Sequence, residues 1–297
     1  MPLLIAPVFN SVSPGPLRLE LPNGFYLVSG NEKMYRLAER FLRNEMNENR
    51  HFFDKRVEEN SLFVCADTPH MKLKDERAMV EELENKLNLA SLDGICSIPY
   101  VITANPPTYG INYLKRSLEG PQLKFSGQTR EVFQSLISVN RPLPTLAFRR
   151  YMLSLEKENI EDQLLDLWIA LESLFVPDGK KGEITFKLRV RMAYYFGETF
   201  AERKRISDFI KSSYNHRSEI VHSGKQFDSV LDQEVLLLRR MARAAILNIG
   251  MEGISLQEMR VRLDELLLTG KSYTQQYEPA FFERVSIVCE NVTLSVQ

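Results

Sequence analysis

Apolar residues recur at two different spacings along this chain, and the spacing changes near residue 145. Before that point, short apolar runs are bounded by Pro, Gly, Asn and Asp, which is typical of β-strands. Two longer segments carry apolar residues every three or four positions, which predicts amphipathic helices. The expected strands are Gly24–Ser29, Ser61–Ala66 and Ser97–Thr103, and the expected helices are Lys33–Met46 and Asp75–Leu89. A mixed α/β domain is therefore predicted here.

A proline-containing boundary, Arg141-Pro-Leu-Pro144, separates this part from a helical one. Both prolines disfavour a helix around them. Beyond the boundary, the apolar spacing becomes helical. The expected helices are Phe148–Glu158, Glu161–Phe175, Thr185–Phe196 and Val230–Ile249. We expect the last of them to be broken at Gly250 and Gly253, because glycine is unfavourable inside a helix.

Capping signals predict where two further helices begin. Thr199 is followed three residues later by Glu202, which indicates a capping box and a helix that continues to Gly224. Ser255-x-x-Glu258 indicates a last helix that ends near Gly270.

The final segment, Arg284–Val296, alternates loosely and predicts a strand that returns to the N-terminal sheet. The chain is thus expected to be an α+β protein with three parts. They are a mixed α/β domain over residues 1–145, an all-α bundle over residues 146–252, and a helix and strand over residues 253–297.

Composition limits the kind of partner and compartment. The net charge is about −1, so any site for a polyanion must be a local patch. Cys65, Cys96 and Cys289 are too few and too scattered for a disulfide framework or a thiolate metal site, which favours a reducing compartment. The start lacks a basic signal-peptide region, and no apolar run approaches the ~20 residues that span a bilayer. We expect a soluble, cytoplasmic protein with no membrane partner, metal or cofactor.

One short segment combines residues suited to phosphate chemistry. Residues 214–224 read Tyr-Asn-His-Arg-Ser-Glu-Ile-Val-His-Ser-Gly, with Arg217 and His222 near the predicted helix end. Arginine presents a rigid, charged fork of donors that matches phosphate, and histidine exchanges protons near neutral pH. The chain has no phosphate-binding glycine loop, dinucleotide-binding glycine motif or zinc signature. Residues 214–224 are therefore the best candidate for chemistry.

This segment resembles the Arg-x₄-His motif of the HEPN family (higher eukaryotes and prokaryotes nucleotide-binding), with the ApeA-like branch as the nearest match. The resemblance also rests on Trp168-Ile-Ala-Leu-Glu172-Ser-Leu-Phe175 and on the basic helix Phe186–Tyr195. It covers roughly residues 150–250. It implies that the helical part is a HEPN-like bundle.

The resemblance also implies an activity. HEPN ribonucleases cleave RNA without a metal ion, and many act as toxins or antiviral defence effectors. Carried onto this chain, Arg217 would hold the scissile phosphate, and His222 would act as general base or general acid. Ser218 would hydrogen-bond near the phosphate, and Glu172 would orient the arginine or the histidine. The products would be a 2′,3′-cyclic phosphate and a 5′-hydroxyl.

Other residues are candidates for RNA contacts. Tyr214 is placed to pack against the motif or to contact a base, and His216 is a second possible proton donor. Lys187 and Arg191, with neighbouring cations, could follow an RNA backbone. Residues 1–145 are expected to hold a sensor for an activating ligand or a site for a regulatory partner, because an unregulated ribonuclease would harm its host.

Helix geometry adds a condition to this mechanism. Positions five residues apart on a regular helix lie about 140° from each other. One regular helix therefore cannot direct Arg217 and His222 at the same point. Either the last turn unwinds before Gly224, or a second copy of the chain completes the site in a two-fold homodimer.

Several readings remain open beside the ribonuclease. The chain could be a non-catalytic HEPN module that binds RNA or nucleotide, or a scaffold for protein interaction. Arg217 could be a surface cation paired with Glu172 or Glu219, and His222 could cap the helix end. The apolar stripe on the last long helix could be a dimer surface or the centre of the core. Its members are Val235, Leu236, Leu238, Met241, Ala245 and Leu247.

Overall fold

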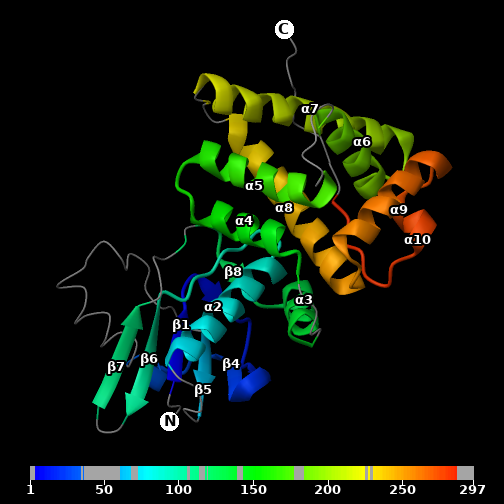
Figure 1. Ribbon diagram of the computed structural model, residues 1–297. Coiled ribbons are helices and arrows are strands. Elements are labelled where there is room, and N and C mark those ends of the chain that lie inside the picture. Colours follow the sequence, from blue (N-terminus) through cyan, green and yellow to red (C-terminus); the bar gives the residue numbers. More distant parts are fainter. Residues whose placement is uncertain are drawn as a thin grey trace. The chain divides into compact units, whose positions relative to one another are not determined.

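The computed structural model (Figure 1) describes residues 4–34, 36, 61–67, 73–105, 108–113, 118, 120–138, 143–176, 184–224, 227 and 230–285. The chain divides into two compact units, Met1–Asn140 and Arg141–Gln297. The first unit combines strands with helices and the second is helical. The α+β class, with a mixed α/β part followed by a helical part, is confirmed.

An antiparallel sheet forms the centre of the first unit, in the strand order β3-β4-β5-β1-β6-β7. Its strands are β1 Leu4–Val8, β3 Arg18–Glu20, β4 Phe25–Ser29, β5 Leu62–Ala66, β6 Tyr100–Asn105 and β7 Thr108–Tyr113. Two short strands outside it, β2 (Ser11–Val12) and β8 (Leu123–Lys124), pair in parallel. The strands predicted around β4, β5 and β6 are confirmed, with shifted ends.

The first strand, β1, lies inside the sheet although its sequence contains Pro7. It pairs with β5 along its whole length but with β6 only at Leu4 and Ile5. Phe9 exchanges both backbone hydrogen bonds with Ser97, at 2.7 and 3.2 Å. Pro7 lies two residues earlier and therefore directs its nitrogen to the same side, where the ladder with β6 has ended. The missing N–H thus costs no ladder hydrogen bond.

Two helices of the first unit, α2 (Leu73–Ala90) and α3 (Gly127–Ser138), pack together. The helix predicted at Asp75–Leu89 is confirmed by α2. Its buried Asn88 exchanges hydrogen bonds of 2.8 and 2.9 Å with the backbone of Cys96, and buried Glu84 accepts one of 2.7 Å from the Ile98 N–H. These side chains bind backbone groups of Cys96 and Ile98, just before β6, that a neighbouring strand would otherwise bind. Most of the helix predicted at Lys33–Met46 falls outside the described residues.

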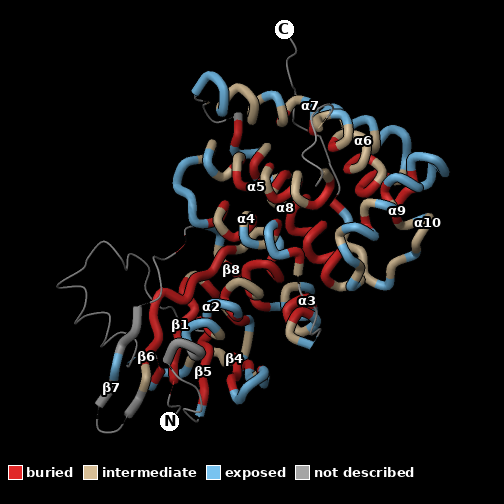
Figure 2. The backbone as a smooth tube through the Cα atoms, in the orientation of Figure 1, coloured by how far each residue is buried: buried red, intermediate tan, exposed pale blue. Residues whose placement is uncertain are grey.

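The second unit consists of helices packed around a common apolar core (Figure 2). They are α4 Thr145–Glu156, α5 Ile160–Phe175, α6 Ile184–Phe196, α7 Phe200–Ser223, α8 Val230–Glu252, α9 Leu256–Thr269 and α10 Tyr273–Tyr277. Every helix predicted in this part is found within a few residues of its expected ends. Trp168 and Phe175 of α5 are fully buried, as are most apolar positions of α8.

The structure corrects one expectation for α8 and decides a second point that the sequence left open. The helix runs through Gly250 and ends at Gly253, which adopts a left-handed φ of 70°. Gly250 lies against Leu143, because a Cβ there would lie 2.4 Å from the Leu143 side chain. The apolar stripe is core and not a dimer surface, since Val235, Leu238 and the positions that follow are buried within one chain. Leu236 alone of that stripe is exposed.

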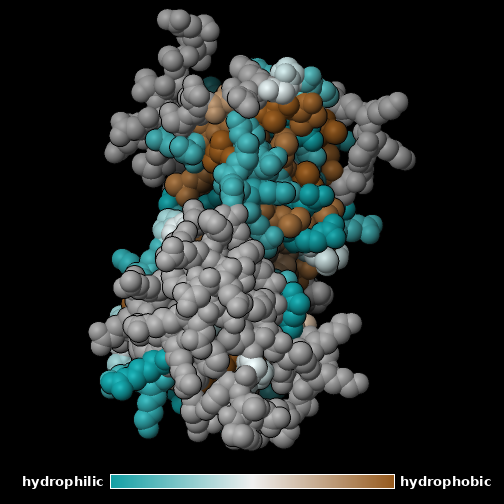
Figure 3. Space-filling model, turned by 90° about the vertical axis from the view of Figure 1, so that its left-hand side faces the viewer, coloured by the Kyte–Doolittle hydropathy of each residue, from teal (hydrophilic) through white to brown (hydrophobic). Residues whose placement is uncertain are grey.

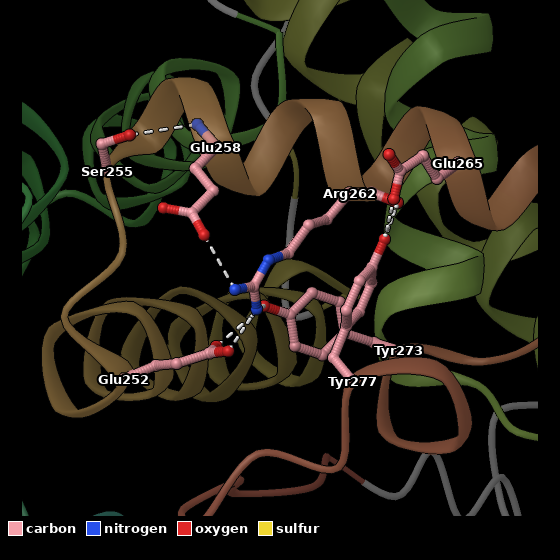
Figure 4. A network of polar contacts seen from close by, with 7 residues as sticks. All are labelled: Glu252, Ser255, Glu258, Arg262, Glu265, Tyr273 and Tyr277. Atoms are coloured by element: carbon pink, nitrogen blue, oxygen red, sulfur yellow. Dashed lines mark hydrogen bonds and ion pairs between the residues drawn. The ribbon is translucent and has the colours of Figure 1, made fainter.

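Polar contacts fix the last helices to the end of α8 (Figure 4). Arg262 of α9 binds Glu252 of α8 and Glu258 of its own helix, and its guanidinium lies over the ring of Tyr277. The Tyr273 hydroxyl donates to Glu252 at 2.8 Å, and the Tyr277 hydroxyl donates to Glu265 at 2.7 Å. These contacts join α10 to α8 and α9.

The chain after α10 is held in a similar way. Asn248 of α8 exchanges two hydrogen bonds with the backbone of Glu283, at 2.7 and 3.1 Å, and buried Arg243 pairs with the Glu283 carboxylate. Arg284 and Val285 are not part of a strand. The rest of the strand expected at Arg284–Val296 lies outside the described residues.

Two buried glycines of the helical unit give opposite expectations for an added methyl group. At Gly197, between α6 and α7, a Cβ would lie 2.9 Å from two backbone atoms, the Ala193 oxygen and the Arg203 nitrogen. We expect Gly197→Ala to lower the free energy of unfolding by roughly 1–3 kcal/mol, because backbone cannot move aside cheaply. Gly250→Ala should cost less, because the Leu143 side chain can rotate and alanine favours the helix.

Denaturant unfolding followed by tryptophan fluorescence measures both changes, because Trp168, the only tryptophan of the chain, lies in the core of the helical unit. If Gly250→Ala lowered the free energy of unfolding as much as Gly197→Ala, the expected difference between a rigid backbone neighbour and a movable side-chain neighbour would be wrong.

Candidate functional site

The motif lies near the end of one continuous helix, α7. The predicted capping box opens this helix: the Thr199 hydroxyl accepts from the Glu202 N–H at 3.2 Å, and the Glu202 carboxylate accepts from the Thr199 N–H at 3.0 Å. The predicted stop is also confirmed, because Gly224 has a left-handed φ of 60° and donates to the Ile220 carbonyl. The helix does not unwind before Gly224.

Helix geometry places Arg217 and His222 on different sides of α7. The buried positions of the helix are Ile206, Ile210 and Ser213, which mark the side that faces the bundle. At about 100° per residue, Arg217 lies about 40° from Ser213 and His222 about 180° from it. In agreement, Arg217 is partly buried and His222 is exposed. The two residues therefore do not meet within one chain.

Arg217 of α7 contacts one side chain of α5 and one of its own helix. Its Nη2 lies 3.4 Å from Oε1 of Glu172, and each of the two side chains is 24% exposed. Its guanidinium carbon lies 5.3 Å from the centre of the Tyr214 ring, one helical turn earlier. That ring meets the Trp168 ring edge-on at 5.1 Å. The carboxylate and the aromatic pair thus fix where the cation lies.

The same surroundings shift the pKa of Tyr214. Burial raises the pKa of its phenol above the ordinary value of 10, and the negative charge of Glu172 raises it further, while Arg217 lowers it. The phenol therefore stays protonated in neutral solution and can donate a hydrogen bond.

Part of the hydrogen-bonding capacity at this pair is unused. Among the described residues, Nε of Arg217 and Oε1 of Glu172 are buried and have no hydrogen-bond partner. At 3.4 Å, the ion pair is longer than a typical charge-assisted hydrogen bond. The guanidinium therefore keeps donors that an anion could accept from.

His216 takes part in a separate polar chain on the α8 side of α7. Its Nδ1 lies 2.8 Å from Oε2 of Glu234, and its ring packs against Phe227. The other carboxylate oxygen of Glu234 accepts from the Ser213 hydroxyl, which in turn accepts from the Trp168 indole N–H at 3.2 Å. His216, a candidate for RNA contact, thus has intramolecular partners. No sequence signal pointed to Glu234.

The two basic candidates on α6 differ in their contacts. Arg191 donates to the Phe175 carbonyl, at the last residue of α5, at 2.6 Å. It also binds both carboxylate oxygens of Asp264. Lys187 is partly buried on the same helix. Ser218 follows Arg217 and is also partly buried. The structure joins Glu172, Tyr214 and Arg217 into one cluster, and it does not bring Lys187, Arg191 or His222 into it.

Metal-binding clusters and membrane-spanning helices are both absent from the described residues. No group of three or more His, Cys, Asp or Glu side chains there is placed to hold a metal ion. Nor does any helix of the described chain combine the length and apolar character that crossing a bilayer requires.

The surroundings of Tyr214 predict a measurable titration. The absorbance of wild type minus that of Tyr214→Phe reports the tyrosinate form of Tyr214. This signal should appear only above pH 10, because burial and Glu172 favour the neutral phenol. In a Glu172→Gln background, the same difference should titrate at lower pH. The raised pKa also means that this residue's contribution to folding stability is complete below pH 10 and is lost as the pH rises through the folded-state pKa. A wild-type difference that titrates at the ordinary value would contradict this environment.

Comparisons with known proteins give no assignment for this chain. No family model, curated protein or solved structure matches it significantly. The HEPN resemblance therefore stays a prediction that rests on the residues of the motif and of α5.

Proposed function

We propose that this chain is a HEPN-type endoribonuclease that cleaves RNA at a site shared by two copies in a homodimer. The observation that supports this best is the placement of Arg217. It is a partly exposed guanidinium, fixed by Glu172 and Tyr214, that keeps an unpartnered buried donor. A positioned arginine with spare donors is suited to bind a phosphodiester.

His222 supplies the proton-transfer group of the proposal. It is exposed in the last turn of α7. Histidine can take a proton from the ribose 2′-hydroxyl or give one to the leaving 5′-oxygen. In the proposed reaction the 2′-oxygen attacks phosphorus, the bond to the 5′-oxygen breaks, and the departing oxygen gains a proton. The products are a 2′,3′-cyclic phosphate and a 5′-hydroxyl end.

The homodimer follows from the helix geometry. Because α7 is regular, Arg217 and His222 face nearly opposite directions, so a phosphate bound by Arg217 would meet the histidine of a second copy. An apolar side chain within the motif supports such contact, because Val221 is 50% exposed. On the side where α7 ends, both hydrophobic and hydrophilic side chains reach the surface of the helical unit (Figure 3).

A second function is favoured by one observation. Glu172 already neutralises Arg217, and His222 is directed away from it, so a single chain could bind RNA or nucleotide without cleaving it. In both cases we propose a toxin or antiviral defence role, with residues 1–145 as the part that an activating ligand or a regulatory partner would contact.

Cleavage in the presence of a chelator tests the enzyme. Labelled single-stranded RNA is incubated with the protein in EDTA, and the products are examined for 2′,3′-cyclic phosphate ends. We expect cleavage by wild type and a loss of at least about a hundredfold in Arg217→Ala and His222→Ala, because each removes a group that acts in the transition state. Lys204→Ala is a suitable control, because Lys204 lies on α7 and is paired with Asp208. Arg217-dependent binding without cleavage would favour the second function.

Mixing the two inactive variants tests whether the site is shared. After subunit exchange, half of the dimers contain one copy of each variant, and one of the two sites in such a dimer joins an intact Arg217 to an intact His222. The mixture should therefore recover about a quarter of wild-type activity if each site takes one residue from each copy. Recovery should not occur if both residues act from the same chain, and that result would rule out the shared site.

A further inference from the structure

Glu234 on α8 links three side chains that belong to two other helices. One carboxylate oxygen accepts from the Ser213 hydroxyl, and the other lies 2.8 Å from Nδ1 of His216. Ser213 also receives the indole N–H of Trp168, from α5, at 3.2 Å. Ser213 and Trp168 are fully buried and the Glu234 side chain is 9% exposed, so these groups are largely removed from water.

The linkage continues to the proposed phosphate-binding residue. Trp168 meets the Tyr214 ring edge-on at 5.1 Å, and the guanidinium of Arg217 lies over that ring at 5.3 Å. The two partners of Glu234 on α7, Ser213 and His216, are three residues apart and therefore lie on one side of the helix. Two bonds from a single carboxylate to that side restrict both the rotation of α7 and its shift along its axis.

A buried carboxylate is costly unless its hydrogen bonds are satisfied, so the position of α7 at which Glu234 binds both partners is strongly favoured. Any rotation of α7 that separates Ser213 or His216 from Glu234 would also move Arg217, which follows His216 directly. It would also change the contact of Tyr214 with Trp168.

We propose that Glu234 is a positioning residue for Arg217: through Ser213, Trp168 and His216 it fixes the orientation of α7 in which the guanidinium can receive an RNA phosphate. This inference rests on the proposed function. It assigns to α8 a role in the site although no residue of α8 belongs to the motif.

Binding of a non-cleavable RNA separates positioning from folding. The probe is a fluorescein-labelled single-stranded 2′-O-methyl RNA, and the quantity measured is its Kd for the full chain at a temperature where every variant is folded. Glu234→Leu keeps the volume and removes both acceptors. We expect it to raise the Kd roughly tenfold, because small displacements of a charge-assisted donor weaken its bond steeply.

Two variants complement this change. Glu234→Gln should stay within about twofold of wild type, because the amide can accept from Ser213 and donate to His216 in its other tautomer. Ser213→Ala interrupts the chain between Glu234 and Trp168 with a smaller change of volume. It should raise the Kd in the same direction, and it provides the test if Glu234→Leu does not fold.

A matched control distinguishes loss of stability from loss of position. Asp166 of α5 is also a largely buried carboxylate, with 7% of its side chain exposed, and it pairs with Arg150 of α4 at 2.8 Å. Asp166→Leu should lower the midpoint of denaturant unfolding, as Glu234→Leu does, but leave the Kd unchanged. The fluorescence emission of Trp168 should shift in Glu234→Leu and Ser213→Ala and not in Asp166→Leu.

The outcomes separate this inference from the proposed function. If Arg217→Ala weakens RNA binding but Glu234→Leu and Ser213→Ala do not, the positioning role is wrong and the phosphate site stands. If Arg217→Ala has no effect on binding, the proposed function is wrong and the positioning role fails with it. If Asp166→Leu and Glu234→Leu raised the Kd equally, Glu234 would contribute only to stability and the positioning role would be wrong.

Discussion

The regular, unbroken course of α7 is the constraint on which every reading of the motif depends. A helix that keeps its hydrogen bonds to Ser223 fixes about 100° between neighbours, so Arg217 turns towards the bundle and His222 towards solvent. The residues that make α7 regular lie at its two ends, where Thr199, Glu202 and Gly224 satisfy backbone groups that would otherwise lack partners. Local capping therefore keeps these two residues on different sides of α7 within one chain.

Many arginines of the helical unit have structural partners inside the chain. Arg191 and Arg260 donate to the carbonyls of Phe175 and Ser173 at the end of α5, and buried Arg243 pairs with Glu283. Arg217 differs because its ion pair with Glu172, at 3.4 Å, is longer than the contacts of those arginines. A chain with almost no net charge can still offer an anion a local site where a carboxylate compensates a cation loosely.

The sequence predicted best what depends on neighbouring residues. Capping boxes and left-handed glycines act over three or four residues, so the start of α7 and the ends of α7 and α9 could be predicted correctly. It predicted less well what depends on distant contacts. The strand β1 was missed because Pro7 is acceptable only where the ladder with β6 has ended. The break expected at Gly250 was wrong because that glycine accommodates Leu143, more than a hundred residues away.

By itself, the sequence determined the α+β class, the helices of the second unit, and the presence of an arginine, a histidine and an acidic residue at the spacing of a known motif. Only the tertiary structure decided which of them meet. Glu172 and Arg217 lie on different helices, and Tyr214 joins them because Trp168 supports its ring. Glu234 enters the same arrangement from α8 without any signal in the sequence. The physical reason is that helical periodicity fixes the direction of a side chain on its own helix, whereas its partners are fixed by how the helices pack.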